Sequence, residues 1–306
     1  MTGKSKGPGR PSKLQLLERA KKQIIIDIES YSRELNKRVF SEAEINSLLV
    51  LYQRDQVLYA TTRLKDFIDF LIDQKILIKI NIEVPFGSGK TKKYALGDVS
   101  ELEIALAIQS GSYLSHYSSM YLHELIENIP QVVYANKEQS RKPRYGSDLS
   151  QESLDRAFAR PMRKTKQIAQ YDRFKIFLIN GKNTGNLGVI DHDLNGITIR
   201  ITGLERTLVD AVVRPDYAGG VEEVLKAFTA AKGRVSVNKM LAILKKMDYM
   251  YPYHQVVGFY LERAGYKENV LQLVEELGIE FNFYLTYQIT DKVLNDRWKL
   301  YVPRRF

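Results

Sequence analysis

The most informative segment of this 306-residue chain reads TGLERTLVDAVVRPDYAGGV and spans residues 202–221. Thr202 and Glu205 have the spacing of a capping box, in which two side chains accept hydrogen bonds from backbone amides at a helix start. Arg214 precedes Pro215, so this helix is expected to end there. Its apolar residues recur at helical spacing and predict one buried stripe, formed by Leu204, Leu208, Val209 and Val212.

The rest of the segment predicts a second helix and a pair of structural arginines. Gly219 and Gly220 let the chain turn into the second helix after the rigid Arg-Pro corner. Arg206 and Arg214 lie at the two ends of the first helix, and each guanidinium needs an acidic or phosphate partner. Carboxylates are available within the segment at Glu205, Asp210 and Asp216. We therefore expect both arginines to be paired with carboxylates around the corner.

The same residues resemble a known signature. Glu-Arg-Thr-Leu-Val-Asp followed by Arg-Pro-Asp-Tyr-Ala-Gly-Gly is similar to the motif of AbiEi-family antitoxins. The positions that carry this motif are Glu205, Arg206, Asp210, Arg214, Pro215, Tyr217, Gly219 and Gly220. Three further stretches fit the same family, within residues 121–134, 180–182 and 251–266. The resemblance covers most of residues 100–306 and is much weaker over the first hundred.

This resemblance implies a function. Proteins of this family are the DNA-binding half of type IV toxin–antitoxin and phage-exclusion (abortive infection) systems. The resemblance implies a repressor that binds operator repeats in double-stranded DNA and regulates its own operon. It also implies a nucleotidyltransferase-like toxin as partner, which is neutralised without a stable complex.

Composition favours a cytoplasmic protein that binds a polyanion. The formal net charge is +10 and the isoelectric point is near 9.4, which concentrates polyanions such as nucleic acid around a protein. A basic protein with no such partner is the alternative. There are no cysteines, which excludes disulfides and thiolate metal sites. No apolar run approaches the roughly 20 residues of a membrane span, and no secretory signal is recognisable.

Capping residues and hydrophobic period predict the organisation of the first hundred residues. A basic Gly- and Pro-rich tail over 1–13 is expected to be disordered. A helix over 14–35, with Leu14 and Leu35 facing inward, is followed by a helix that Ser41 and Glu44 cap. A third helix begins at a cap formed by Thr61 or Thr62. Alternating isoleucines over 76–82 and a strand over 93–96 then predict a two-stranded ribbon.

Three helices and a ribbon in this order are typical of a winged helix-turn-helix, which we expect over residues 14–97. The remainder, 98–306, is expected to form a larger α+β domain with a mixed sheet, so the predicted fold class is α+β. Its expected strands include 132–135, 174–180, 187–190 and 196–201. Its later helices extend to about residue 277, and strands are expected over 281–287 and 298–302.

Several residues of the first domain are candidates for DNA contact. Arg10 lies in a Gly-Arg-Pro segment that resembles an AT-hook core, although Pro8 replaces the usual first arginine. The start of the third helix offers Thr62, Arg63 and Lys65. The exposed face of that helix also carries Asp66, Asp69 and Asp73, which phosphates would repel, so only its first turn is expected near DNA. The ribbon tip supplies three cations for phosphate contact, Lys90, Lys92 and Lys93. Val84 stands where a phosphate-binding loop needs glycine, so we expect no nucleotide site in this ribbon.

A second basic surface is predicted in the larger domain. One part is the polar loop around Pro143, with Arg141, Lys142 and Arg144. The other is a stretch with seven cations and one acid, Asp172, from residue 157 onward. Its cations are Arg156, Arg160, Arg163, Lys164, Lys166, Arg173 and Lys175. A solvated helix face is the alternative interpretation of such a charge run.

The sequence gives little support to catalysis. The four histidines have no metal-binding spacing, and no nucleophile elbow is present. Asp191-His192-Asp193 precedes Asn195-Gly196 and is interpreted as part of a hairpin turn. His123 and His254 are interpreted as hydrogen-bonded core histidines. We expect no enzyme activity, metal or cofactor. A protein-interaction module and a cryptic nuclease remain the alternatives.

Overall fold

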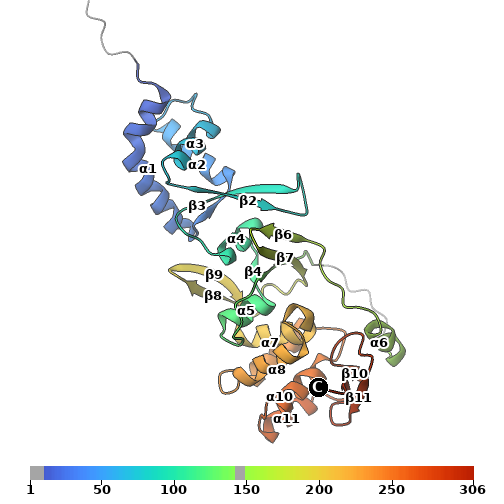
Figure 1. Cartoon of the computed structure of the whole chain (residues 1–306). Coiled ribbons are helices and arrows are strands. Elements are labelled where there is room, and N and C mark those ends of the chain that lie inside the picture. Colours follow the sequence, from blue (N-terminus) through green and yellow to red (C-terminus); the bar gives the residue numbers. More distant parts are fainter. Residues whose placement is uncertain (1–9, 142–148) are drawn as a thin grey trace, which may run out of the picture. The chain divides into compact units, whose positions relative to one another are not determined.

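The computed structural model describes residues 10–141 and 149–306 and has an α+β fold (Figure 1). The chain divides into two compact units. The first ends at Ile108 and includes Asn195–Thr198, and the second comprises Gln109–Leu194 and Ile199–Phe306. No helix within the described ranges is long and apolar enough to cross a membrane.

The first unit contains three longer helices, a short one, a β-hairpin and a two-residue strand that pairs with it (Figure 1). Its elements are α1 (Lys13–Leu35), β1 (Val39–Phe40), α2 (Glu42–Arg54), α3 (Leu64–Asp73), β2 (Ile78–Glu83), β3 (Lys90–Ala95) and α4 (Glu101–Ile108).

The predicted cap of α2 is confirmed. Ser41 Oγ accepts a hydrogen bond from the Glu44 amide at 3.4 Å, and Glu44 Oε2 accepts one from the Ser41 amide at 2.8 Å. The apolar faces of the three helices meet in one core, which contains Ile24, Ile28, Ile45, Leu48, Leu49, Tyr52, Phe67 and Leu71. An apolar face on each of the three helices therefore accounts for this core.

Two details of the first unit were predicted wrongly. The N-cap of α3 is Arg63, one residue after the later of the two expected caps, and it makes no capping hydrogen bond. Thr62 lies in a turn, in which its amide donates a hydrogen bond to the Tyr59 carbonyl, and its side chain is buried. Leu14 and Leu35 are exposed because the core contacts only the middle of α1, from Leu17 to Ser32.

The hairpin is regular and antiparallel, with Glu83 opposite Lys90 and Asn81 opposite Lys92. Its first strand starts later than the isoleucine alternation suggested. Ile76 lies before the strand, and Ile78 is exposed.

Helix α4 belongs to the first unit, whereas the sequence placed the boundary near Gly97–Ser100. The guanidinium of Arg38 donates two hydrogen bonds to the buried carboxylate of Glu103, at 2.9 and 2.8 Å. This two-point contact ties α4 to the segment before β1. Composition gave no sign of it, since the two residues are far apart in the chain.

The second unit combines a mixed sheet with a helical layer (Figure 1). Its elements are β4 (Tyr113–Leu114), α5 (His116–Leu122), β5 (Val132–Glu138), α6 (Gln151–Phe158), β6 (Ile168–Tyr171), β7 (Phe174–Gly181), β8 (Val189–Leu194), β9 (Ile197–Thr202), α7 (Leu204–Val213), the 3-10 turn η1 (Pro215–Tyr217), α8 (Val221–Ala230), α9 (Val237–Met247), α10 (Tyr253–Arg263), α11 (Glu268–Glu275), β10 (Phe283–Tyr284), β11 (Lys292–Asn295) and β12 (Leu300–Pro303).

The strands of this unit follow the order β6-β7-β5-β4-β9-β8. Strand β5 runs parallel to β7, and β4 runs parallel to β9, while the β6–β7 and β4–β5 pairs are antiparallel. A small separate sheet has the order β10-β12-β11. Helix α7 is the centre of the helical layer, because every residue from Glu205 to Val213 is buried.

The capping box predicted at the start of α7 is wrong. The N-cap is Gly203, and no side chain caps the helix. Glu205 is held by the start of α9 instead: it accepts a hydrogen bond from the Ser236 amide at 3.2 Å and pairs with Lys239 at 2.8 Å. The helix does end at Val213, as the Arg-Pro corner predicted.

Other parts of the second unit were missed or misplaced. Asp191, His192 and Asp193 lie inside β8, and only Asn195-Gly196 forms the turn. Helix α6 and strands β6 and β11 were not predicted. These elements are short and half-exposed, so their hydrophobic period is weak.

Gly258 in the middle of α10 is explained by packing. A Cβ at this position would overlap the six-membered ring of the fully buried Trp298. The missing side chain lets β12 and the segment before it approach the helix, which offsets the low helix propensity of glycine.

We predict that Gly258→Ala lowers the free energy of unfolding by about 2–3 kcal/mol, since overpacking a core of this density forces side chains to move. Urea denaturation gives the value. Trp298→Phe removes the overlapping ring atoms, so the double variant should lose less than the sum of the two single losses. Additive losses would mean that the helix accommodates the methyl group elsewhere.

Candidate functional site

Four cationic residues gather where α3 begins, and we call them the α3-entry cluster: Arg10, Lys13, Arg63 and Lys65. The Arg10 guanidinium lies 4.3 Å from the centroid of the Tyr59 ring, and the Tyr59 hydroxyl donates to the Pro11 carbonyl at 2.8 Å. The Lys13 ammonium donates to the Thr61 carbonyl. These contacts hold the chain that enters α1 against the loop that leads into α3.

The predicted contact residues of α3 differ in accessibility. Arg63 and Lys65 are exposed, whereas Thr62 is 4% exposed and cannot reach a base edge. Arg63 forms an ion pair with Asp66 at 2.8 Å, which raises the pKa of the guanidinium through a direct hydrogen bond. Because the pair is largely exposed, it contributes little to stability and a phosphate can replace the carboxylate.

Strand alternation divides the three hairpin lysines. Lys90 and Lys92 lie on one face and are exposed. Lys93 lies on the other face of β3, where Ile80 is its cross-strand partner, and it is only partly exposed. Burial lowers the pKa of Lys93. Phosphate contact was predicted for all three lysines, but only Lys90 and Lys92 share an accessible face.

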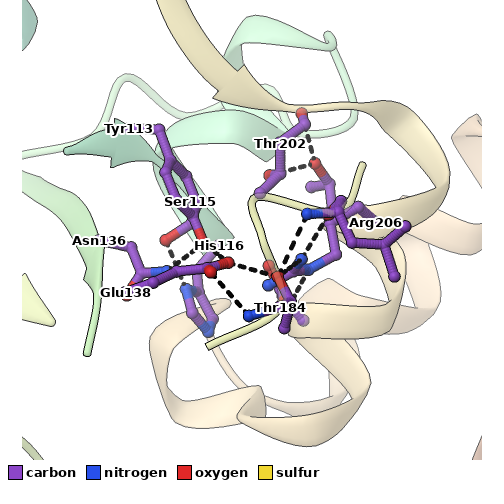
Figure 2. A network of polar contacts seen from close by, with 11 residues as sticks. Tyr113, Ser115, His116, Asn136, Glu138, Thr184, Thr202 and Arg206 are labelled. Carbon is purple, nitrogen blue, oxygen red and sulfur yellow. Dashed lines mark hydrogen bonds and ion pairs between the residues drawn. The ribbon is translucent and has the colours of Figure 1, made fainter. Parts of the chain in front are cut away.

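The polar centre of the second unit is a buried ion pair on α7 (Figure 2). Arg206 Nε donates to Asp210 Oδ1 at 2.9 Å, and the two residues are 3% and 5% exposed. Burial opposes the charge on Arg206, but the attraction of Asp210 outweighs this effect, and the pKa of the guanidinium is raised. The expected carboxylate partner of Arg206 is confirmed.

Further contacts extend this centre to the loop before β8 (Figure 2). Arg206 Nη1 donates to the Leu187 carbonyl at 2.6 Å. The same loop is held by Glu138, which accepts hydrogen bonds from the Thr184 hydroxyl and amide. Burial raises the pKa of Glu138, but these hydrogen bonds lower it below its ordinary value. The loop is thus joined to both β5 and α7.

His116 lies beside this centre and is buried. Its Nδ1 is 2.9 Å from Ser115 Oγ, and its ring packs edge-on against Tyr217 at 5.4 Å between centroids. Burial lowers the pKa of His116 to about 4. Sequence reasoning did not single out His116, because its only signal is a histidine in an ordinary polar context.

The remaining motif residues shape the corner after α7. Among the described residues, Arg214 has no carboxylate partner, contrary to prediction. Its Nη1 donates to the Arg163 carbonyl at 3.0 Å, and its guanidinium lies 5.7 Å from the centroid of the Tyr217 ring. The Pro215 carbonyl oxygen accepts a hydrogen bond from the Gly220 amide at 2.8 Å, and this bond closes the corner.

The two glycines of the corner are required by backbone conformation. Gly219 has φ +85° and Gly220 has φ +98°. A Cβ on Gly219 would also lie 2.8 Å from the Tyr117 ring. No other residue adopts these angles without strain.

All seven cations of the predicted basic stretch are exposed, but their neighbours differ. Lys164 pairs with Asp216 at 2.8 Å, and Lys166 and Arg141 are exposed. Lys142 and Arg144 lie outside the described residues. Arg160 and Arg163 line a cavity of about 730 Å³ that also reaches His116, Arg206 and Asp210.

Two of the histidines are satisfied by backbone, as predicted. His123 Nε2 lies 2.7 Å from the Thr202 carbonyl oxygen, and His254 Nε2 lies 2.6 Å from that of Gly278. Within residues 10–141 and 149–306, no group of three His, Asp or Glu side chains is arranged to hold a metal ion.

Comparison with known proteins gives the fold alone. No family model matches the chain, and no curated protein matches its sequence. The structure is similar to the crystal structure of RV2827C protein from Mycobacterium tuberculosis, with a TM-score of 0.55 and 12% sequence identity. The match covers 90% of this chain and 89% of that chain. The likeness therefore supports an α+β fold of the whole chain.

We predict that Arg206→Ala lowers the free energy of unfolding by about 3–5 kcal/mol, because it leaves the Asp210 carboxylate buried without its counter-charge. Denaturation by urea at neutral pH measures the loss. Arg304→Ala is the matched control, since Arg304 and Asp291 form a pair at the same 2.9 Å that is more than 60% exposed. The control should cost less than about 1 kcal/mol. Equal losses of unfolding free energy in the two variants would contradict the prediction that burial determines how much an ion pair contributes to stability.

The pKa of His116 predicts a pH dependence of stability. The folded state holds this histidine neutral down to about pH 4, whereas the unfolded chain binds a proton near pH 6.5. The unfolded state therefore binds more protons between these values, and stability falls as the pH drops from 6.5 to 4, by about 3 kcal/mol for this group.

The measurement is the difference in unfolding free energy between the parent protein and His116→Asn across this pH range. Asparagine is chosen because it tolerates the positive φ of 50° at this position. The variant should show a shallower pH dependence. Since His123 and His254 remain in both proteins, parallel curves would contradict the assignment of this titration to His116.

Proposed function

We propose that this protein is a sequence-specific DNA-binding repressor whose first unit is a winged helix-turn-helix. The observation that carries the proposal is the α3-entry cluster. Four cations lie at the positive end of the helix dipole, where α3 has no capping side chain. A DNA phosphate is the ligand that such a helix end favours.

The distribution of charge along α3 defines how the helix would meet DNA. Arg63 and Lys65 lie in or beside its first turn, and Asp69 and Asp73 are exposed further along. Only the first turn can approach the duplex, because the later carboxylates are repelled by phosphate. Recognition helices of this class contact base edges through their N-terminal residues, so this placement is compatible with readout.

The hairpin supplies phosphate contacts in the same proposal. Lys90 and Lys92 form an exposed pair on one face of β3, as a wing requires. In the second unit, the exposed cations Arg141 and Lys166 add contacts that carry no sequence information.

The biological role that we propose is that of a type IV antitoxin. The support is the resemblance of residues 202–221 to the AbiEi motif, together with the structural importance of the motif residues Arg206, Asp210 and Gly219. The protein would act in the cytoplasm, repress its own operon and neutralise a nucleotidyltransferase-like toxin without forming a stable complex.

A protein-interaction role for the first unit is the second candidate. It is favoured by the carboxylates on the exposed face of α3, which suit a basic protein partner better than DNA. The two candidates differ in salt dependence, because DNA binding releases counterions from the duplex.

We predict that Arg63→Ala combined with Lys65→Ala weakens binding to the duplex upstream of the gene and makes the salt dependence shallower. Each lost phosphate contact lowers the slope of log K against log salt by about 0.9. Fluorescence anisotropy at several salt concentrations measures both quantities. Lys75→Ala is the control, since Lys75 is exposed at the other end of α3. Unchanged affinity and slope in the double variant would remove α3 from the interface.

The hairpin contains its own control. Lys90→Ala combined with Lys92→Ala should reduce affinity for all duplexes, whereas Lys93→Ala should not.

For the antitoxin role, co-expression with the adjacent toxin gene is the assay. If a variant loses operator binding but still protects growth, repression and neutralisation are separate activities. If the parent protein does not protect growth against the toxin, the antitoxin proposal is contradicted.

A further inference from the structure

The cavity of the second unit has the size and position of a small-molecule site. Its volume is about 730 Å³, within the range of roughly 300–1,000 Å³ that is usual for ligand pockets. The segment after α6, the centre of α7 and the segment between α9 and α10 line it. All of its lining residues belong to one unit.

The walls of the cavity carry a large excess of positive charge. Of the residues that the structure describes, five cationic side chains line it and the only lining carboxylate is that of Asp210, which Arg206 already neutralises. The other four are Arg160, Arg163, Lys182 and Arg214. Within the part of the chain that the structure describes, neither Arg160 nor Arg163 forms an ion pair, and both are exposed. Two exposed guanidiniums at the edge of a pocket match the oxygens of a phosphate group.

The inner end of the cavity offers two hydrogen-bond acceptors. Asp210 Oδ2 and Asn136 Oδ1 are buried and have no hydrogen-bond partner among the described residues. Buried acceptors of this kind are rare in folded proteins because each costs desolvation energy. Gly181 lets the Asn136 amide pack directly against the backbone of β7, since a Cβ at Gly181 would lie 2.6 Å from Asn136 Oδ1. A ligand with N–H or O–H donors would satisfy both oxygens.

One side of the cavity is aromatic. Tyr249, Tyr251, Tyr253 and Tyr287 line it together with Met247 and Met250. Tyr249 and Tyr251 each pack edge-on against Tyr253, at 5.4 and 6.1 Å between ring centroids. Rigid aromatic walls of this kind favour a flat ring system as ligand.

We propose that this cavity binds a nucleoside phosphate. The phosphate lies on Arg160 and Arg163 at the edge, the base packs against the tyrosines, and the sugar hydroxyls or base amino group donate to Asp210 and Asn136. Neither phosphate alone nor a nucleoside alone uses all three parts of the cavity. The inference is independent of DNA binding by the first unit.

The test uses the full-length protein and isothermal titration calorimetry with ATP, GTP, adenosine and inorganic phosphate. We expect ATP or GTP to bind at least tenfold more tightly than adenosine or phosphate. Arg160→Ala combined with Arg163→Ala should weaken nucleotide binding by about tenfold or more, through the lost charge-assisted hydrogen bonds. Arg163→Ala keeps the backbone carbonyl that Arg214 uses, so the corner remains intact.

Lys166→Ala is the matched control, because Lys166 is an exposed cation three residues from Arg163 that does not line the cavity. It should leave nucleotide affinity unchanged. Absence of nucleotide binding, or equal binding by the Arg160/Arg163 double variant, overturns the proposal. If that double variant instead loses affinity only for duplex DNA, the two arginines serve the DNA backbone and the proposal is wrong. The Arg63/Lys65 variant should bind nucleotide normally, so failure of the DNA proposal is recognised separately.

Discussion

The buried pair of Arg206 and Asp210 is the interaction on which the second unit depends. It places two opposite charges on one face of α7, where both are removed from water. The desolvation cost of such a pair is partly offset by further hydrogen bonds to its polar atoms, although Asp210 Oδ2 has none among the described residues. The Leu187 carbonyl satisfies the guanidinium, and this requires the loop before β8 to pass close to α7. Gly188 allows that approach, since a Cβ there would lie 2.9 Å from Arg206 Cβ.

Three consecutive residues of α7 bind three different elements. Glu205 holds the start of α9, Arg206 holds the loop before β8, and Thr207 binds Thr202 at the end of β9 through a hydroxyl pair at 2.8 Å. The helix thus acts as the common support of sheet and helical layer. The motif that resembles the AbiEi signature is a set of structural contacts, and the same set positions Asp210 at the inner end of the cavity.

Cations of the two units have different physical environments and therefore different tasks. Arg10, Arg63 and Lys65 of the α3-entry cluster and the two lysines of the hairpin face are exposed, where charge speeds the capture of polyanions and is screened by salt. Arg206 is buried and its charge is already used within the fold. Arg160 and Arg163 are exposed too, but they lie at the edge of a pocket. The net charge of +10 does not distinguish these environments.

Local sequence signals predicted what depends on neighbours in the chain. The capping box at Ser41, the amphipathic faces of α1 to α3, the end of α7 at Arg214 and the glycine corner all follow from short-range sterics and hydrogen bonding. Signals of this range also predicted that Arg206 needs a carboxylate, because Asp210 is one helical turn away.

Tertiary structure decided every feature that joins distant residues. Glu205 has the spacing of a cap, yet a partner some thirty residues later in the chain outcompetes the local amide. Arg214 binds a backbone carbonyl fifty-one residues away, Thr62 turns inward, and Lys93 lies on the buried side of its strand. The cavity could not be predicted either, because its walls come from segments that only folding brings together. Hydrogen bonds and burial depend on distance in space, and sequence spacing reports that distance only within a turn or two of the same element.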